Sequence, residues 1–185
     1  MTIIVNFFCE AGGGKSSIST GVFSELKWMG VNCEYTPEWC KNMVWEERPA
    51  PFKNQNYIFG KQHYNIQRLV GKLDVIITDS PILLSAFYNN KSEENEIFNQ
   101  HVLNEFNKFN NVNYFLKRVK PFQPKGRFQT AEEAKQDDIL LKELLDKYGV
   151  SYQIINGEKA SVEPLANQIK SMVLTQKQAK AWKEK

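Results

Sequence analysis

The stretch Cys9-Glu-Ala-Gly-Gly-Gly-Lys-Ser-Ser17 decides the fold of this chain. Residues 2–8 before it are β-branched and aromatic, as is typical of a buried parallel strand. After it, apolar residues recur at helical spacing, and Gly30 stands where that helix is expected to end. These apolar residues are Ile18, Val22, Leu26 and Met29. A strand, a glycine-rich turn, Gly-Lys-Ser and a helix, in this order, indicate a phosphate-binding loop.

This loop is predicted to bind ATP and Mg²⁺. Its backbone N–H groups and the positive end of the following helix attract phosphate. Lys15 is expected to reach the β and γ oxygens, and the Ser16 hydroxyl to hold the metal ion. The predicted ATP-binding residues are Ala11, Gly12, Gly13, Gly14, Lys15, Ser16 and Ser17. The full pattern has glycine where this chain has Cys9, whose side chain is also small.

The composition is that of a soluble globular domain. The chain has 185 residues, of which 42% are hydrophobic and 24% charged, and its net charge of +3 is too small to indicate nucleic acid binding by itself. No stretch approaches the roughly 20 apolar residues of a membrane span, and the N-terminus lacks the basic region of a signal peptide. The three cysteines show neither metal-ligand spacing nor a disulfide framework. We therefore expect a cytoplasmic protein without structural zinc or membrane contact.

Strand-like and helical segments alternate along the chain. The strand-like runs are residues 2–8, 31–35, 73–78, 112–117 and 151–155. Such alternation predicts an α/β fold with three layers, in which a parallel five-stranded sheet carries helices on both faces and binds ligands at the carboxyl ends of its strands. Residues 1–175 are predicted to form this domain, and residues 176–185 a polar tail that frays or forms a weakly held helix.

Local signals place two of the later helices. Thr130-Ala-Glu-Glu133 reads as a capping box that opens a helix. Ser161 is expected to cap the last helix, whose core face would contain Leu165, Ile169 and either Met172 or Val173.

Residues 75–81, Val-Ile-Ile-Thr-Asp-Ser-Pro, form an apolar strand that ends in an acid. Many strands end at an aspartate that begins a turn, so this pattern alone is weak. In a phosphate-loop protein, however, a second carboxylate that organises Mg²⁺ belongs at such a position. Ser16 and Asp79 are therefore the predicted metal residues.

The chain resembles P-loop kinases, and most closely the small AAA-type ATPase and kinase domains related to nicotinamide riboside kinase (NadR-like) that tailed phages often encode. The resemblance spans about residues 2–156. It rests on residues 12–16 (Gly-Gly-Gly-Lys-Ser), 36–39 (Thr-Pro-Glu-Trp) with Trp45-Glu46, 78–81 (Thr-Asp-Ser-Pro), 118–121 (Arg-Val-Lys-Pro) and 126–129 (Gly-Arg-Phe-Gln). It implies a nucleoside- or nucleotide-kinase-like fold with a lid over about residues 118–130, and the host cytoplasm as the location of a phage protein.

The same resemblance suggests roles for charged residues. Nucleoside kinases have an acid at the tip of the second strand, which points to Glu38 as the group that accepts or aligns the proton of the acceptor hydroxyl. The alternative is that Glu38 is only an acid in the first turn of a helix. Arg118 and Arg127 of the lid-like segment would close onto the triphosphate, unless that segment is simply a solvated basic loop. The predicted catalytic residues are Lys15, Glu38, Asp79, Arg118 and Arg127.

Acceptor recognition is expected between the second and third strands, where related kinases bind the acceptor. The predicted substrate-binding residues are Trp39, Tyr57, Phe59 and Gln62. Packing under an irregular loop is the alternative for each aromatic residue. His63 and Arg68 are weaker candidates for a phosphate contact.

Three functions fit these features. The first is a phosphotransferase that moves the γ-phosphate of ATP to a nucleoside, a nucleotide or a related small metabolite. The second is a kinase acting on a hydroxymethylated pyrimidine in DNA. The third is a nucleotide-dependent regulatory ATPase. The expected partners are ATP, a small-molecule acceptor and possible further copies of the chain in a homodimer.

Overall fold

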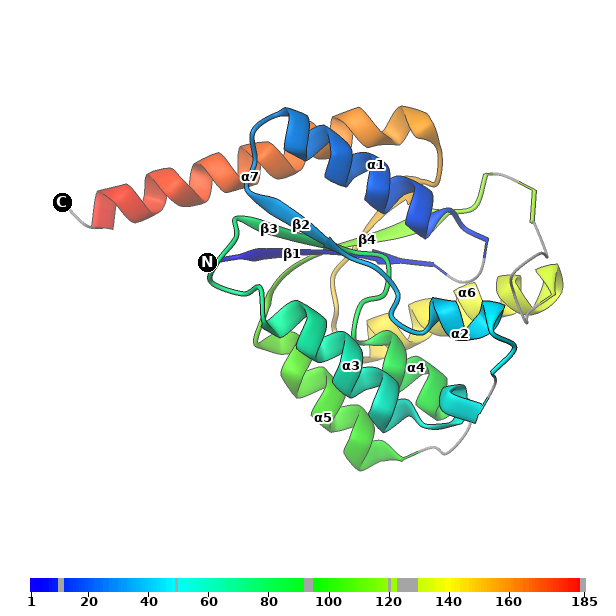
Figure 1. Cartoon of the computed structure of the whole chain (residues 1–185). Coiled ribbons are helices and arrows are strands. Elements are labelled where there is room, and N and C mark those ends of the chain that lie inside the picture. The colour runs from blue at the N-terminus through cyan, green and yellow to red at the C-terminus, as the bar shows by residue number, and fades with distance from the viewer. Residues whose placement is uncertain (10–11, 49, 92–94, 120, 123–129, 184–185) are drawn as a thin grey trace.

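The computed structural model of the chain describes residues 1–9, 12–48, 50–91, 95–119, 121–122 and 130–183 (Figure 1). Its strands are β1 (Ile3–Phe8), β2 (Cys33–Thr36), β3 (Val75–Thr78), β4 (Asn110–Lys117) and β5 (Gln153–Asn156). Its α-helices are α1 (Lys15–Trp28), α2 (Lys41–Trp45), α3 (Gln55–Gln67), α4 (Leu84–Asn90), α5 (Glu96–Asn107), α6 (Ala131–Lys147) and α7 (Val162–Lys183). Two short 3₁₀ helices are η1 (Ala50–Lys53) and η2 (Lys159–Ser161). All five predicted strands are present, with ends shifted by one or two residues.

The strands form one parallel sheet in the order β2-β3-β1-β4-β5. Helices α1 and α7 cover one face, and α3, α4, α5 and α6 cover the other (Figure 1). This architecture confirms the predicted fold class. Because all strands run in the same direction, the ends of β1, β2 and β3 and the loops that follow them meet at one edge of the sheet. We call this edge the carboxyl edge.

The apolar core lies in two layers, one on each face of the sheet. In β1, Ile3, Val5 and Phe7 pack toward α1 and α7, whereas Ile4 and Phe8 pack toward the other helices. Burial of both faces explains why this strand is almost continuously apolar.

The exception in β1 is Asn6, which is also buried. Its Nδ2 atom donates hydrogen bonds of 2.9 Å to the Oδ1 atoms of both Asn111 and Asn113 on β4. These bonds satisfy a polar group that would otherwise be costly to bury.

The predicted capping box is found in the structure, whereas Ser161, the predicted cap of the last helix, is the final residue of η2. Thr130 and Glu133 form both hydrogen bonds of a capping box at the start of α6. Helix α7 begins directly after Ser161 and buries Leu165, Ile169 and Val173. It then continues as a helix through most of the predicted tail. Among the described residues, every helix is too short or too polar to span a bilayer.

Candidate active site

The phosphate-binding loop leads from β1 into α1 at the carboxyl edge. Gly12 and Gly14 have φ angles of 84° and 95°, which side chains with a Cβ atom rarely adopt. Glycine at these two positions therefore allows the sharp turn after which α1 begins at Lys15. The Lys15 ammonium group donates a hydrogen bond to the carbonyl of Cys9, so it lies at the end of β1. Ala11, one of the predicted ATP-binding residues, lies outside the described residues.

Ser16 and Asp79 are brought together although they lie on different elements. The Ser16 hydroxyl donates a hydrogen bond of 2.6 Å to Oδ2 of Asp79. Asp79, directly after β3, is 3% exposed. A hydroxyl and a carboxylate are oxygen ligands of the kind that Mg²⁺ prefers, so the two predicted metal residues fit that ion.

Asp79 also contacts the loop after β2. Its Oδ1 atom accepts a hydrogen bond of 3.0 Å from the backbone N–H of Glu38. The strand order explains this arrangement, because β3 lies between β1 and β2 in the sheet. A carboxylate at the end of β3 can therefore reach both the phosphate-binding loop and the predicted acceptor-side loop.

The Glu38 carboxylate has a partner within its own loop. The Cys40 thiol donates to Oε1 of Glu38 over 3.5 Å. Burial, together with the charge of Glu38, raises the pKa of Cys40 well above its usual range, so the thiol stays protonated and remains a donor. This contact orients the acid that was predicted to face the acceptor.

Tyr35 on β2 is a site residue that the sequence analysis missed. Its hydroxyl lies against Asp79 and Ser19, and its ring packs against Phe23 with centroids 6.2 Å apart. Burial and the negative charge of Asp79 raise the pKa of Tyr35, which favours a neutral phenol beside the carboxylate. The signal in the sequence was only a tyrosine near the end of a predicted strand.

Two of the predicted acceptor-binding residues form an aromatic pair beside Glu38. The rings of Trp39 and Tyr57 meet edge to face with centroids 5.0 Å apart. The ammonium group of Lys61 lies 5.8 Å from the Trp39 centroid and 5.6 Å from the Tyr57 centroid. Tyr57 is 44% exposed, so the pair offers an aromatic surface with a nearby positive charge.

Gln62 lies behind this pair and connects it to β3. Its Oε1 accepts a hydrogen bond of 3.2 Å from the Trp39 backbone N–H, and its Nε2 donates to Thr78 Oγ1 over 3.3 Å. The side chain is almost completely buried. Recognition of an acceptor base by Gln62 stays a prediction, and it requires one of these bonds to be exchanged.

Phe59 is not brought to the aromatic pair. It is buried in the core between α3 and α5, edge to face with Phe98. His63 stacks on Phe59 with centroids 5.4 Å apart and lies 3.5 Å from the Glu105 carboxylate. Burial lowers the pKa of His63. Both residues therefore serve the α3–α5 interface in this structure.

Arg118 lies against α6. Its Nη2 atom donates to Oδ2 of Asp138 over 2.8 Å and to the carbonyl of Ala134 over 3.3 Å. The side chain is only 14% exposed. A role for Arg118 on the triphosphate stays a prediction, and it requires this ion pair to open. Arg127, with most of the predicted lid, lies outside the described residues.

Gly157, directly after β5, is a second residue that the sequence analysis missed. A Cβ atom built on Gly157 would lie 2.4 Å from the carbonyl oxygen of Gly13 in the phosphate-binding loop. The Gly157 N–H also donates to the Lys117 carbonyl at the end of β4 over 2.9 Å. The turn after β5 thus supports the phosphate-binding loop from behind, and only glycine allows this approach.

Replacing Gly157 with alanine is expected to weaken ATP binding by about tenfold or more, because the new methyl group must displace either the turn or the Gly13 peptide. The measurement is the ATP dissociation constant by calorimetry. Gly60→Ala is the matched control, since Gly60 lies on α3 with no atom within 4 Å of its added Cβ. Equal ATP affinity of folded Gly157→Ala and wild-type protein would contradict the supporting role.

A parallel sheet in the order 2-3-1-4-5, with Gly-Lys-Ser after its central strand, is the fold of P-loop nucleoside kinases. A solved structure of that class, deoxyadenosine kinase from M. mycoides with bound dATP, is similar to this chain with a TM-score of 0.57. The match covers 90% of this chain and 99% of that one at 16% sequence identity, and it shows the likeness of fold. No protein-family model matches the chain, and no curated protein matches its sequence.

Proposed function

We propose that this protein is an ATP-dependent phosphotransferase that moves the γ-phosphate to a nucleoside, a nucleotide or a related small metabolite. The observation that carries the proposal is the position of Asp79. One carboxylate oxygen accepts from Ser16 on the donor side, and the other accepts from the Glu38 backbone on the acceptor side. The loop that carries Glu38 is therefore held beside the two predicted metal residues, which suits direct transfer from ATP to an acceptor bound at that loop.

The residues divide the chemistry between them. The amides of residues 12–16 and the Lys15 ammonium group bind the phosphates of ATP. Ser16 and Asp79 would hold Mg²⁺, which would supply positive charge to the phosphates of ATP. Glu38 aligns the acceptor hydroxyl or accepts its proton, and Trp39 and Tyr57 provide the surface against which a planar acceptor stacks. The proximity of these groups lowers the barrier mainly by positioning.

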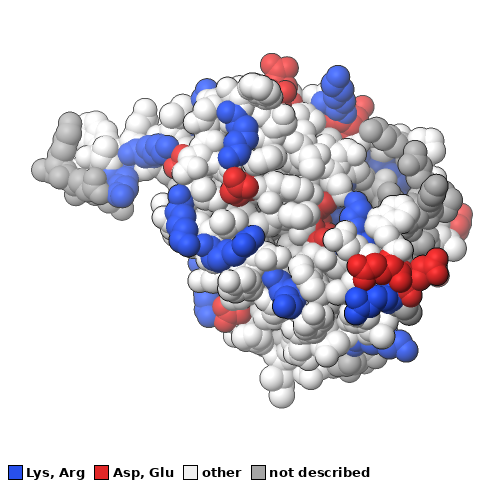
Figure 2. Space-filling view, in the orientation of Figure 1, with Lys and Arg blue, Asp and Glu red and all other residues white. Residues whose placement is uncertain are grey.

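The fold of the deoxyadenosine kinase structure supports a nucleoside-type acceptor. A duplex DNA acceptor is less well supported. On the face shown in Figure 2, the acidic and basic side chains of the described residues are interspersed, and the net charge of +3 is small for a protein that follows a DNA backbone.

The proposal is tested by a screen for transfer of ³²P from [γ-³²P]ATP. The acceptors are nucleosides, nucleoside monophosphates, nicotinamide riboside and hydroxymethylated DNA. We expect label in one class of small molecule, with ADP released only when that acceptor is present. Label in DNA alone would identify the DNA kinase. Slow ADP release without any labelled acceptor would instead identify a regulatory ATPase and contradict the phosphotransferase.

A further inference from the structure

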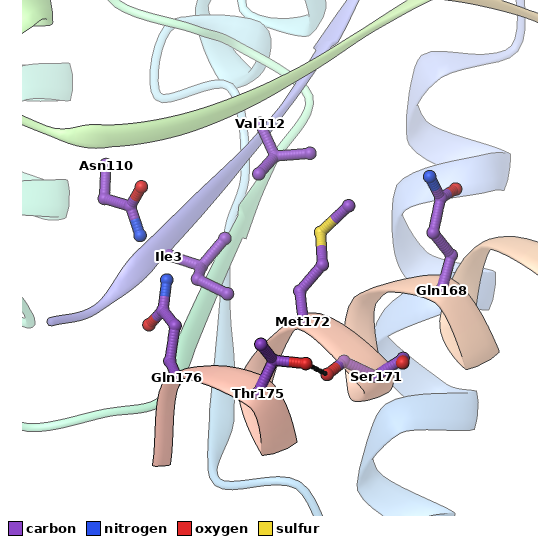
Figure 3. A pocket seen from close by; sticks show the side chains of 8 residues that line it. All are labelled: Ile3, Asn110, Val112, Gln168, Ser171, Met172, Thr175 and Gln176. Carbon is purple, nitrogen blue, oxygen red and sulfur yellow. Dashed lines mark hydrogen bonds between the residues drawn. The ribbon is translucent and has the colours of Figure 1, made fainter. Parts of the chain in front are cut away.

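A pocket of about 470 Å³ lies on the edge of the sheet opposite to the candidate active site (Figure 3). Ile3 and Asn110, the first residues of β1 and β4, line it together with Val112. The rest of the lining comes from one flank of α7, namely Gln168, Ser171, Met172, Thr175 and Gln176. Its floor is apolar and its rim carries amides and hydroxyls. The proposed kinase chemistry makes no use of it.

Helix α7 continues beyond this pocket and away from the body of the protein (Figure 1). Val173 is its last buried residue among those described. All described side chains from Lys177 to Trp182 are exposed, and Trp182 is 83% exposed. A tryptophan at the end of a projecting helix exposes one of the largest apolar side chains, and an isolated helical segment of this length is only marginally stable in water.

Trp182 and the pocket lie on the same flank of α7. Trp182 follows Thr175 by seven residues, about two helical turns or roughly 10 Å along the axis. A protruding group and a pocket on the same flank of one helix are self-complementary. Two such helices that run antiparallel can each place the protruding group in the pocket of the other, which is the geometry of a two-fold dimer.

We propose that α7 pairs with α7 of a second copy of this chain across a two-fold axis near residues 178 and 179. In this arrangement, Trp182 of each chain enters the pocket beside Thr175 of the partner.

The chemistry of the two surfaces fits this pairing. The indole ring would cover Ile3, Val112 and Met172, and its N–H would find an acceptor among the amide oxygens at the rim.

The residues between pocket and tryptophan also favour close pairing. Ala179 is small and lies on the same flank, which allows the helix axes to approach. Lys177 lies on the opposite flank, where it is paired with Asp74 over 2.7 Å, so its charge would not be buried. The dimer leaves the carboxyl edge of each chain open, so the candidate active site of each chain remains accessible.

The oligomeric state tests the proposal. We expect analytical ultracentrifugation of the full chain to show a concentration-dependent dimer, and Trp182→Ala to weaken dimerisation by about tenfold or more. Trp28→Ala is the matched control, because Trp28 is 85% exposed but lies on α1. A wild-type protein that is monomeric at all concentrations would overturn the proposal, and so would equal weakening by both variants.

Cross-linking tests the predicted register. Ala179→Cys should form a disulfide-linked dimer under mild oxidation, whereas Ala181→Cys, about 200° around the helix from Ala179, should not. The three native cysteines are free and buried, so they are poor competitors. A dimer whose cross-linking is equal for the two variants would overturn the antiparallel pairing. Because none of these measurements depends on catalysis, failure here leaves the proposed phosphotransferase untouched.

Discussion

Lys15→Ala is expected to reduce ATP turnover by at least about 10³-fold, in the range found when a preorganised donor to a transition-state charge is removed. The Lys15 ammonium group is held at the end of β1 by the Cys9 carbonyl, beside the loop amides. It is therefore placed to neutralise charge on the transferring phosphate. The measurement is ADP formation in the presence of the acceptor that the transfer screen identifies.

The control for this substitution is Lys27→Ala. Lys27 lies on the same helix, but in its last turn, where it pairs with Glu34 over 3.2 Å at the surface. Removing it tests the loss of one positive charge from α1 without touching the loop, so turnover should stay close to wild type. If Lys15→Ala retains wild-type turnover, ATP is bound elsewhere and the candidate site is wrong.

Glu38→Gln is expected to reduce phosphoryl transfer by roughly 10²–10⁴-fold, the usual contribution of a general acid or base. ATP binding should persist, because the backbone N–H of Glu38, and not its carboxylate, contacts Asp79. Glutamine keeps the size of the side chain and an oxygen that can still accept from the Cys40 thiol. The substitution therefore isolates the loss of the carboxylate.

The matched control is Glu34→Gln, two residues before the end of β2. Glu34 is exposed and paired with Lys27. Replacing it therefore removes one negative charge from the same segment, as Glu38→Gln does, with little loss of folding stability. Single-turnover measurement with each variant separates chemistry from ATP binding. Unchanged transfer by Glu38→Gln would reduce Glu38 to a backbone contact that positions Asp79.

Much of the fold was predictable because it depends on local patterns. The apolar run before the glycine-rich loop predicts a strand buried on both faces, and β1 is one. The capping box at Thr130 is a short-range hydrogen-bond pattern, and it starts α6 as expected. Strand ends were less accurate, because hydrogen bonds to neighbouring strands decide where pairing stops.

The candidate site was predictable only in its separate parts. Ser16 and Asp79 were each recognisable from a local motif. The strand order that places them within a hydrogen bond of 2.6 Å could not be predicted from those motifs. The engagement of Arg118 by Asp138, and the burial of Phe59 in the core, likewise depend on packing between distant elements.

The sequence by itself therefore determined the phosphate-binding loop, the set of strands and the α/β class, since backbone conformation follows from neighbouring residues. The tertiary structure alone decided which groups meet. It placed β3 between β1 and β2, so that Asp79 reaches both the donor and the acceptor side. It also brought Gly157 into contact with Gly13, although the two residues lie near opposite ends of the sequence. Contacts of this kind arise from sheet order and close packing, which no local pattern encodes.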